Sequence, residues 1–261
     1  MMNPLSNIKL FVLDMDGTFY LGDQILDGSL SFLEKVKETG REFVFFTNNS
    51  SKTGQDYIEK LKRMNCDITR SQIMTSGDVT IAYLKSHHQK QKVYLMGMNT
   101  LKQEFLREGI QIVEEEESEI VVAAFDQSLT YKKLERACTY IRHGALFLAT
   151  HLDINCPTEH GFIPDCGAMC SAITLSTGVS PKYLGKPFYE TLEMIQQQTG
   201  YRIEDIAFVG DRLYTDIACG VNNGAAGILV LSGETKKEDI IHSTVQPSAV
   251  YGSLKDMIKD L

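Results

Sequence analysis

The stretch LFVLDMDGT, residues 10–18, places two carboxylates directly after an apolar run. Residues Leu10 to Leu13 are all apolar, which is typical of a strand buried in a parallel sheet. Asp14 and Asp16 follow at the carboxyl end of this strand, where open α/β sheets bind their ligands. Asp and Gly are also common turn residues. The stretch therefore predicts a functional acid pair, with a plain surface turn as the alternative.

The composition is that of an ordinary globular protein with an acidic surface. The chain has 261 residues, 43% of them hydrophobic and 23% charged, and its formal net charge of −8 comes from 34 acids against 26 lysines and arginines. This length predicts one or two domains. Without a basic stripe, the charge argues against nucleic acid or an anionic membrane as the main partner. A small anion would need positive charges supplied locally.

The sequence shows no targeting or membrane segment. Met1-Met2-Asn3-Pro4 is not a basic region followed by a long apolar stretch. No segment approaches the roughly 18 uninterrupted apolar residues of a spanning helix. The six cysteines include no Cys-x-x-Cys pattern, so we expect reduced, packed thiols. A cytoplasmic protein is the resulting expectation.

Apolar runs alternate with amphipathic segments from end to end, which is the pattern of βα units and a parallel sheet. Strands are expected at 9–13, 42–46, 93–96, 120–124, 146–149, 206–209 and 227–231. Helices are expected at 30–37, 54–64, 131–142, 189–198 and 215–221. The chain is therefore predicted to be of the α/β class.

Three further motifs are found far from the first. They are Thr47-Asn48-Asn49, Gly185-Lys186-Pro187, and Gly210-Asp211 with Asp216. All four motifs lie before about residue 50 or after about residue 184. We therefore expect residues 1–78 and 181–261 to form one domain, with residues 79–180 as a second domain inserted at a loop.

The acids suit the chemistry of a phosphate ester. The ester is doubly anionic, so a carboxylate nucleophile needs a cation to screen the repulsion. Mg²⁺ prefers oxygen ligands and keeps several waters. We assign Asp14 as the nucleophile, Asp16 as the general acid and base, and Asp14, Asp16 and Asp211 as candidate metal ligands.

The other motifs offer groups that can hold a phosphate. Lys186 is the candidate to neutralise the nucleophile and the phosphate together. Thr47 can donate its hydroxyl, Asn48 can orient the nucleophile or substrate, and Gly17 lets the backbone come close. Each has an ordinary alternative: a solvated surface lysine, a helix cap for the Thr-Asn-Asn segment, and plain turn chemistry for Gly17.

Asp211 and Asp216 repeat the layout of the first motif. Asp211 follows the apolar run 207–209, as Asp14 follows its own strand. Asp216 lies five residues further on, near an expected helix start. It is either a group that orients or contacts the metal through water, or a helix N-cap.

Taken together, the four motifs resemble those of the haloacid dehalogenase superfamily, in the right order. The Thr-Asn-Asn-Ser at 47–50 and the large insertion are similar to the NagD-like and p-nitrophenyl phosphatases, which carry a large α/β cap. The similarity extends into the cap through Ala149-Thr150, Asp153 and residues 164–168. The resemblance implies a Rossmann-like core with helices on both faces of a parallel sheet, magnesium-dependent phosphomonoesterase activity, and a mobile cap that sets substrate choice.

The cap segment offers several candidate substrate contacts but no motif that assigns a role to any of them. The segment 151–170 is polar and turn-rich, and we expect it to be a loop. His151 stands where relatives commonly have Asn, so the substrate of a relative does not by itself fix the substrate of this chain. Candidate contacts to a leaving group are His151, Asp153, Asn155, Thr158, His160 and Asp165, each with an ordinary surface loop as the alternative.

The predicted function is hydrolysis of a small-molecule phosphate, such as a sugar phosphate or nucleoside monophosphate. The alternative is a non-catalytic phosphoacceptor or metabolite-binding regulator that uses the same acidic pocket. Asp16 and the large cap argue against that alternative. The sequence leaves a homodimer open and does not name the substrate.

Overall fold

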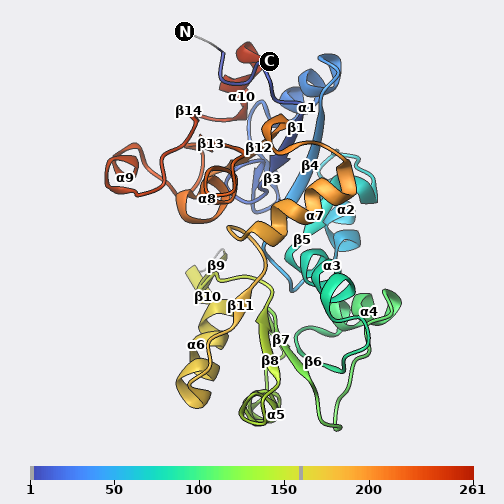
Figure 1. Cartoon of the computed structure of the whole chain (residues 1–261). Helices are drawn as coiled ribbons and strands as arrows, with labels where there is room; N and C mark the ends of the chain where they lie inside the picture. The colour runs from blue at the N-terminus through green and yellow to red at the C-terminus, as the bar shows by residue number, and fades with distance from the viewer. Residues whose placement is uncertain (1–2, 159–160) are drawn as a thin grey trace. The chain divides into compact units, whose positions relative to one another are not determined.

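The structure is a computed structural model that describes residues 3–158 and 161–261. Its chain divides into two compact units. The core unit comprises the residues up to 47, residues 57–74 and residues 186–261, and the inserted unit comprises residues 48–56 and 75–185. Each unit has its own sheet (Figure 1).

The core unit is built on a six-stranded sheet with the strand order β14-β13-β12-β1-β4-β5. The strands are β1 (Leu10–Leu13), β4 (Glu42–Thr47), β5 (Ile73–Thr75), β12 (Ile206–Gly210), β13 (Ala226–Val230) and β14 (Ala249–Tyr251). Strand β1 pairs in parallel with both β12 and β4. The carboxyl ends of the central strands therefore meet at one edge of the sheet.

Burial explains why the central strands carry apolar runs. Every residue of β1 and β12 is buried, as are the last five residues of β4. Aromatic pairs tie the sheet to its surroundings, with ring centroids 5.6 Å apart for Phe11 and Phe32 and 4.7 Å apart for Phe19 and Phe45. Such edge-to-face pairs add to the area that burial alone stabilises.

Helices flank this sheet, and a short hairpin follows β1 (Figure 1). The hairpin consists of β2 (Tyr20–Leu21) and β3 (Gln24–Ile25). The helices of the core unit are α1 (Ser29–Glu38), most of α2 (Gly54–Arg63), α7 (Tyr189–Thr199), α8 (Ala218–Val221), α9 (Lys237–His242) and α10 (Leu254–Met257). A π-helical turn, Leu213–Ile217, precedes α8.

The inserted unit has a four-stranded parallel sheet of its own, ordered β11-β8-β7-β6. Its strands are β6 (Val93–Met96), β7 (Ile120–Ala123), β8 (Leu146–Ala149) and β11 (Lys182–Tyr183), with an antiparallel pair β9 (Asn155–Thr158) and β10 (Gly161–Pro164). Its helices are α3 (Ser76–His87), α4 (Asn99–Arg107), α5 (Tyr131–Arg142) and α6 (Cys166–Thr177).

The boundaries between the two units differ from the predicted boundaries at 78/79 and 180/181. Helix α3 is continuous from Ser76, so a boundary after 78 would cut it, and the segment 48–56 also packs with the inserted unit. The chain thus passes from one unit to the other at Thr47–Asn48 and at Gly185–Lys186. Both crossing points lie inside predicted site motifs.

The expectation of a loop over 151–170 was wrong. Residues 155–158 and 161–164 pair as strands, and α6 begins at Cys166. The side chain of Asp165 caps this helix by accepting a hydrogen bond from the backbone N–H of Cys166 at 2.6 Å. Helix α7 begins at Tyr189, where the expected helix 189–198 begins, and the Lys186–Pro187 peptide bond before it is cis.

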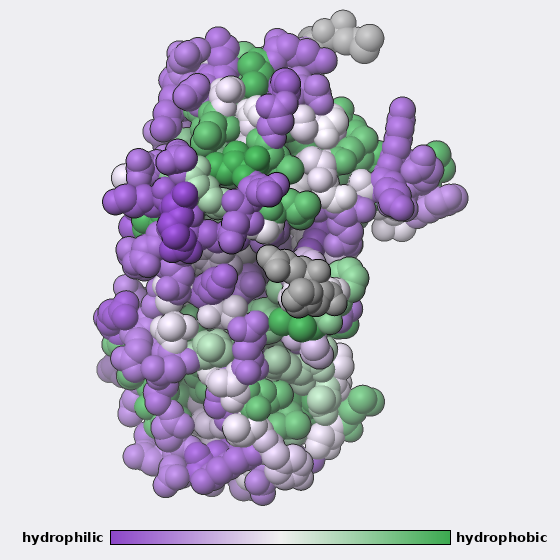
Figure 2. All heavy atoms as spheres, turned by 180° about the vertical axis from the view of Figure 1, so that it is seen from behind, coloured by the Kyte–Doolittle hydropathy of each residue, from purple (hydrophilic) through white to green (hydrophobic). Residues whose placement is uncertain are grey.

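In the part of the chain that the structure describes, no helix is long and apolar enough to cross a membrane. On the face shown in Figure 2, hydrophilic side chains predominate and apolar ones gather in smaller groups among them. Single exposed apolar side chains, such as Leu175 on α6, are normal on a protein surface.

Candidate active site

A buried lysine joins two of the predicted acids in the core unit. The ammonium of Lys186 donates to Oδ1 of Asp14 at 2.6 Å and to Oδ1 of Asp216 at 2.6 Å. A third hydrogen bond, at 3.3 Å, goes to the carbonyl oxygen of Phe46 at the end of β4. Lys186 is only 3% exposed, so the alternative of a solvated surface lysine was wrong.

Asp211 is held beside this group by the turn after β12 and by a second loop. Its Oδ2 accepts a hydrogen bond from the backbone N–H of Glu234 at 2.6 Å, and Thr18 donates to its Oδ1 at 3.4 Å. Gly17 has φ +80°, and a Cβ there would lie 2.6 Å from Oδ2 of Asp211. Glycine is therefore required at 17 for both its backbone conformation and this close approach.

Asp216 lies inside the π-helical turn rather than at a helix N-cap. Its Oδ2 accepts a hydrogen bond from the backbone N–H of Arg212 at 3.1 Å, while its Oδ1 takes the one from Lys186. A Cβ at Gly210 would lie 2.3 Å from the Asp216 side chain. The Gly-Asp spacing thus lets this turn fold back against the strand end.

The carboxylates of Asp14, Asp211 and Asp216 form a group that could hold a metal ion. One ligand atom from each lies within 4.8 Å of the others. Three acids share the single ammonium of Lys186, so the group carries an excess of negative charge. A divalent cation would relieve that excess, and carboxylate oxygens are the ligands that Mg²⁺ prefers.

Burial and crowding shift the pKa values of these groups. Burial raises the pKa of Asp14 to about 8; the charge of Lys186 opposes this rise, and those of Asp216 and Asp211 add to it. Burial and the charge of Asp216 raise the pKa of Asp211 to about 6. Burial disfavours the charged form of Lys186, but Asp14 and Asp216 outweigh it and raise the pKa of the ammonium.

Asp16 and Thr47 occupy the positions that the sequence predicts for them. Asp16 lies in the turn after β1 with an exposed side chain, whereas Asp14 is partly buried. Thr47 is the last residue of β4, the parallel neighbour of β1, and is 9% exposed. Asp16 is not part of the group of three carboxylates described above.

Asn48 belongs to the inserted unit, where it contacts a predicted cap residue. Its amide nitrogen donates to Oδ2 of Asp153 at 3.1 Å, and its backbone carbonyl accepts a hydrogen bond from the hydroxyl of Ser76. Asn48 thus lies next in sequence to Thr47 of the core unit while its side chain orients Asp153.

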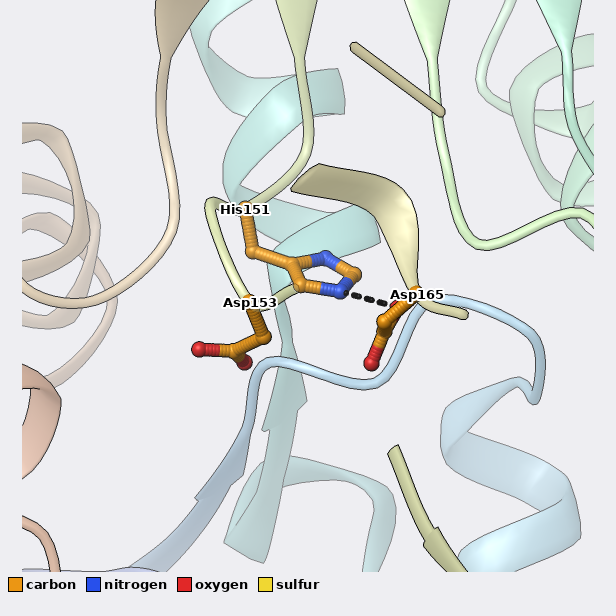
Figure 3. A group of neighbouring side chains, drawn as sticks. All are labelled: His151, Asp153 and Asp165. Atoms are coloured by element: carbon orange, nitrogen blue, oxygen red, sulfur yellow. Dashed lines mark hydrogen bonds and ion pairs between the residues drawn. The ribbon is translucent and has the colours of Figure 1, made fainter. Parts of the chain in front are cut away.

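His151, Asp153 and Asp165 form a second buried polar group, entirely within the inserted unit (Figure 3). Nε2 of His151 lies 2.9 Å from Oδ1 of Asp165. Its Nδ1 lies 2.9 Å from the hydroxyl of Thr150. Asp153 completes the group, with one carboxylate oxygen within 4.8 Å of a ligand atom of each of the other two residues. Its Oδ1 is buried and forms no hydrogen bond to any described residue.

The histidine of this group is held in its charged form. Burial lowers the pKa of His151, but the charge of Cys166, the hydrogen bond that Asp165 accepts, and the charges of Asp165 and Asp153 outweigh it and raise the pKa to about 9. An imidazolium can donate from both ring nitrogens, which suits its two hydrogen bonds. The surface-loop alternative was therefore wrong for His151, Asp153 and Asp165, which are all buried.

The other candidate residues of the cap lie outside the buried group of His151, Asp153 and Asp165 or outside the described residues. Asn155 lies in β9 with an exposed side chain, outside this buried group, and Thr158 is also exposed. His160 lies outside the described residues. Sequence reasoning missed Ser50 and Ser76: Ser50 lies 3.0 Å from the hydroxyl of Thr150, and Ser76 lies 3.4 Å from Nδ1 of His151. Serine is a common residue, and no motif in the sequence distinguishes Ser50 and Ser76 from the other serines of the chain.

Comparison with known proteins places the chain in a family. A family profile described as "Haloacid dehalogenase-like hydrolase" matches residues 11–111, and a second profile for similar hydrolases matches residues 183–257. The chain is 34% identical over 259 residues to an acid sugar phosphatase of Staphylococcus aureus, covering 98% of this chain and 99% of that protein.

Solved structures agree with this. A 4-nitrophenylphosphatase from Thermotoga maritima has a TM-score of 0.94 and 44% identity, with 98% of both chains covered. NagD from E. coli has a TM-score of 0.89 and 30% identity, with 96% of this chain and 98% of that one covered. The staphylococcal and Thermotoga relatives are named as phosphatases, which counts against a non-catalytic regulator. The chain belongs to the haloacid dehalogenase superfamily and, within it, to the NagD-like phosphatases.

Proposed function

We propose that this phosphatase is a magnesium-dependent phosphomonoesterase that hydrolyses small-molecule phosphates through an aspartyl-phosphate on Asp14. The observation that carries the proposal is the buried ammonium of Lys186, 2.6 Å from both Asp14 and Asp216. A buried lysine that binds two carboxylates fixes the nucleophile in place. Together with a bound cation, its ammonium would offset the negative charge of the acids where a phosphate approaches.

Asp14 and Asp211 would hold the magnesium ion, with Asp16 as a further candidate ligand and Asp216 as an orienting group. The fit rests on the three carboxylates whose ligand atoms lie within 4.8 Å of one another. When bound, the ion screens the repulsion between the anionic nucleophile and the anionic ester.

In the first half of the reaction, a carboxylate oxygen of Asp14 attacks phosphorus and the bond from phosphorus to the leaving oxygen breaks. Asp16 gives its proton to that leaving oxygen, so the alcohol departs neutral. The exposed position of Asp16, on the same turn as Asp14, supports this division of roles. Lys186, Thr47 and the backbone at Gly17 hold the phosphoryl oxygens.

In the second half, Asp16 takes a proton from a water molecule as the water oxygen attacks phosphorus. The bond between phosphorus and Asp14 then breaks, which restores the carboxylate and releases inorganic phosphate. Asp16 begins the cycle as an acid and ends it as an acid again, so the protons balance.

For substrate choice we propose the buried group of the inserted unit. Asp153 has one carboxylate oxygen held by Asn48 and one with no hydrogen bond to a described residue, and the latter can accept a hydrogen bond from a hydroxyl of the leaving group. His151 and Asp165 support the loop that carries it, with Asn155 as an exposed candidate. Sugar phosphates, whose leaving groups carry several hydroxyls, are the favoured class, as the name of the staphylococcal relative also suggests.

The test is a phosphate-release screen over some dozens of metabolite phosphates with magnesium present, comparing kcat/KM values. The wild-type protein should hydrolyse several small esters, with sugar phosphates prominent, and Asp14→Asn purified in parallel should show no turnover. Phosphorylation of the wild-type protein by acetyl phosphate without turnover of any ester would instead favour the regulatory alternative.

A further inference from the structure

Tyr20 closes the same turn that carries Asp16. The backbone N–H of Gly17 donates to the carbonyl of Tyr20 at 2.8 Å, and the N–H of Tyr20 donates to the carbonyl of Met15 at 3.1 Å. Asp16 and Tyr20 are also paired by an isolated bridge. The position of the Tyr20 ring is therefore tied by the backbone to that of Asp16.

The Tyr20 side chain is completely buried, yet its hydroxyl meets no described group in full hydrogen-bond geometry. Leaving a buried hydroxyl without a partner costs about 1–3 kcal/mol. Phenylalanine would fill the same space in this apolar core, which contains Phe19 and Phe45, without that cost. Packing therefore explains the ring but not the hydroxyl.

The surroundings keep this hydroxyl protonated. Burial raises the pKa of Tyr20 well above its ordinary value. The charges of Asp16, Tyr57 and Asp14 raise it further, and so does a weak side-chain hydrogen-bonding interaction with Asp16. The ammonium of Lys60 lies 3.9 Å from the ring centroid and fixes the ring face. The hydroxyl is thus a held donor close to the carboxylate of Asp16.

Building on the function proposed above, we infer that Tyr20 is a positioning residue for Asp16, whose carboxylate accepts a hydrogen bond from the Tyr20 hydroxyl during catalysis. Catalytic hydrogen bonds are often long in a free enzyme and tighten when substrate binds. In the step that forms the phosphoenzyme, orienting Asp16 matters only where the leaving oxygen needs a proton. An alkoxide needs one, whereas p-nitrophenolate leaves as a stable anion.

The experiment compares kcat/KM for glycerol phosphate and for p-nitrophenyl phosphate in Tyr20→Phe. The ratio kcat/KM includes departure of the leaving group but not hydrolysis of the phosphoenzyme, so the later step cannot mask the effect. We expect a fall of about tenfold for glycerol phosphate and of less than about twofold for p-nitrophenyl phosphate. The melting temperature should stay the same or rise, because the unpartnered buried hydroxyl is gone.

Tyr251→Phe is the matched control. Its hydroxyl donates to Asp260 at 2.8 Å, so its removal should lower the melting temperature and leave both kcat/KM values unchanged. Equal losses for the two esters in Tyr20→Phe, no loss for either, or a lowered melting temperature would overturn the inference. Asp16→Asn distinguishes a failure of the proposed role of Asp16 from a failure of the role of Tyr20. If it fails to discriminate between the esters, the proposed role of Asp16 falls; if it discriminates and Tyr20→Phe does not, only the role of Tyr20 falls.

Discussion

The two units each bury a small group of acids with one basic residue, but the two groups are built differently. The core group combines Asp14, Asp211 and Asp216 with Lys186, drawn from segments far apart in the chain. The group of the inserted unit comes from positions close in sequence, His151 and Asp153 before the β9–β10 pair and Asp165 directly after it. One is assembled by sheet topology and the other by local chain folding.

Their charges also differ. In the core group three acids face one ammonium, which leaves room for a cation and then for an anionic substrate. In the inserted unit the pKa of His151 is raised to about 9, so this histidine is charged at neutral pH and already pairs with Asp165. The unbalanced charge of the core group is suited to binding a cation and a substrate. The largely paired charges of the group in the inserted unit are suited to stabilising the local chain conformation.

The largest expected contrast is between two single changes of Asp to Asn. Asp14→Asn should lower kcat for p-nitrophenyl phosphate by at least ~10⁴-fold, because the nucleophile is lost. Asp153→Asn should lower it by less than about tenfold, because one hydrogen bond is worth roughly 1 kcal/mol. Steady-state kinetics on both variants measures the contrast, and similar losses in the two would mean that the groups do not have separate roles.

Removing the metal should affect only the core group. Chelation with EDTA should lower activity roughly 10²-fold or more, because the charge screening is lost, and added magnesium should restore it. Magnesium should also raise the melting temperature of the wild-type protein and of Asp153→Asn, but not of Asp211→Asn. A shift in Asp211→Asn that matches the wild-type shift would remove Asp211 from the metal site.

Changes at Asp165 should cost stability more than catalysis. Asp165→Ala removes both the partner of His151 and the N-cap of α6, and should lower the free energy of unfolding by about 2–4 kcal/mol. Asp165→Asn keeps a capping oxygen and should lose less. Urea denaturation measures both; with p-nitrophenyl phosphate the folded variants should stay within a few-fold of the wild-type rate.

The smallest predicted effect is a pH dependence of stability in the metal-free protein. Asp14 and Asp211 have folded-state pKa values of about 8 and about 6, above the ordinary value of 3.8. Between those limits the folded state therefore binds more protons than the unfolded state, so stability falls as pH rises. His151 acts in the same direction, because the stability it contributes below pH 6.5 is lost as pH rises through about 9.

The melting temperature in EDTA should accordingly decrease from pH 5 to pH 9. Asp14→Asn, which cannot ionise at that position, should show a shallower decrease. A melting temperature that is constant or rises over this range would contradict the assigned shifts.

The places of Asp14 and Asp211 could be predicted because each follows an apolar strand, whereas the predicted ligand Asp16 lies outside the group of three carboxylates and Asp216 lies inside it. The runs before Asp14 and Asp211 are short and entirely apolar, and β1 and β12 are parallel neighbours, so their following residues meet. Lys186 was predicted from its motif, although its burial could not be. Its ammonium is stabilised by Asp14 and Asp216, which lie far from it in sequence.

The inserted unit was predicted less completely because its signals are local and weak. The sequence signal for helix α3 is the capping box formed by Thr75 and Asp78. The signals for α6 are the N-cap residue Asp165 and Gly178 at its end. The interaction of Asn48 with Asp153 joins residues 105 positions apart and follows no periodic pattern. Asn48 could be singled out by its motif, but its partner Asp153 could not be predicted.

The most direct test of the account is to find where the phosphoryl group goes. The enzyme in excess over p-nitrophenyl phosphate is quenched in acid within the first turnover, and its peptides are analysed by mass spectrometry. If Asp14 is the nucleophile, we expect one added phosphoryl group on the peptide that carries Asp14, and none in Asp14→Asn. A wild-type enzyme that releases p-nitrophenol at a full first-turnover rate with that peptide unmodified, or modified elsewhere, would contradict it.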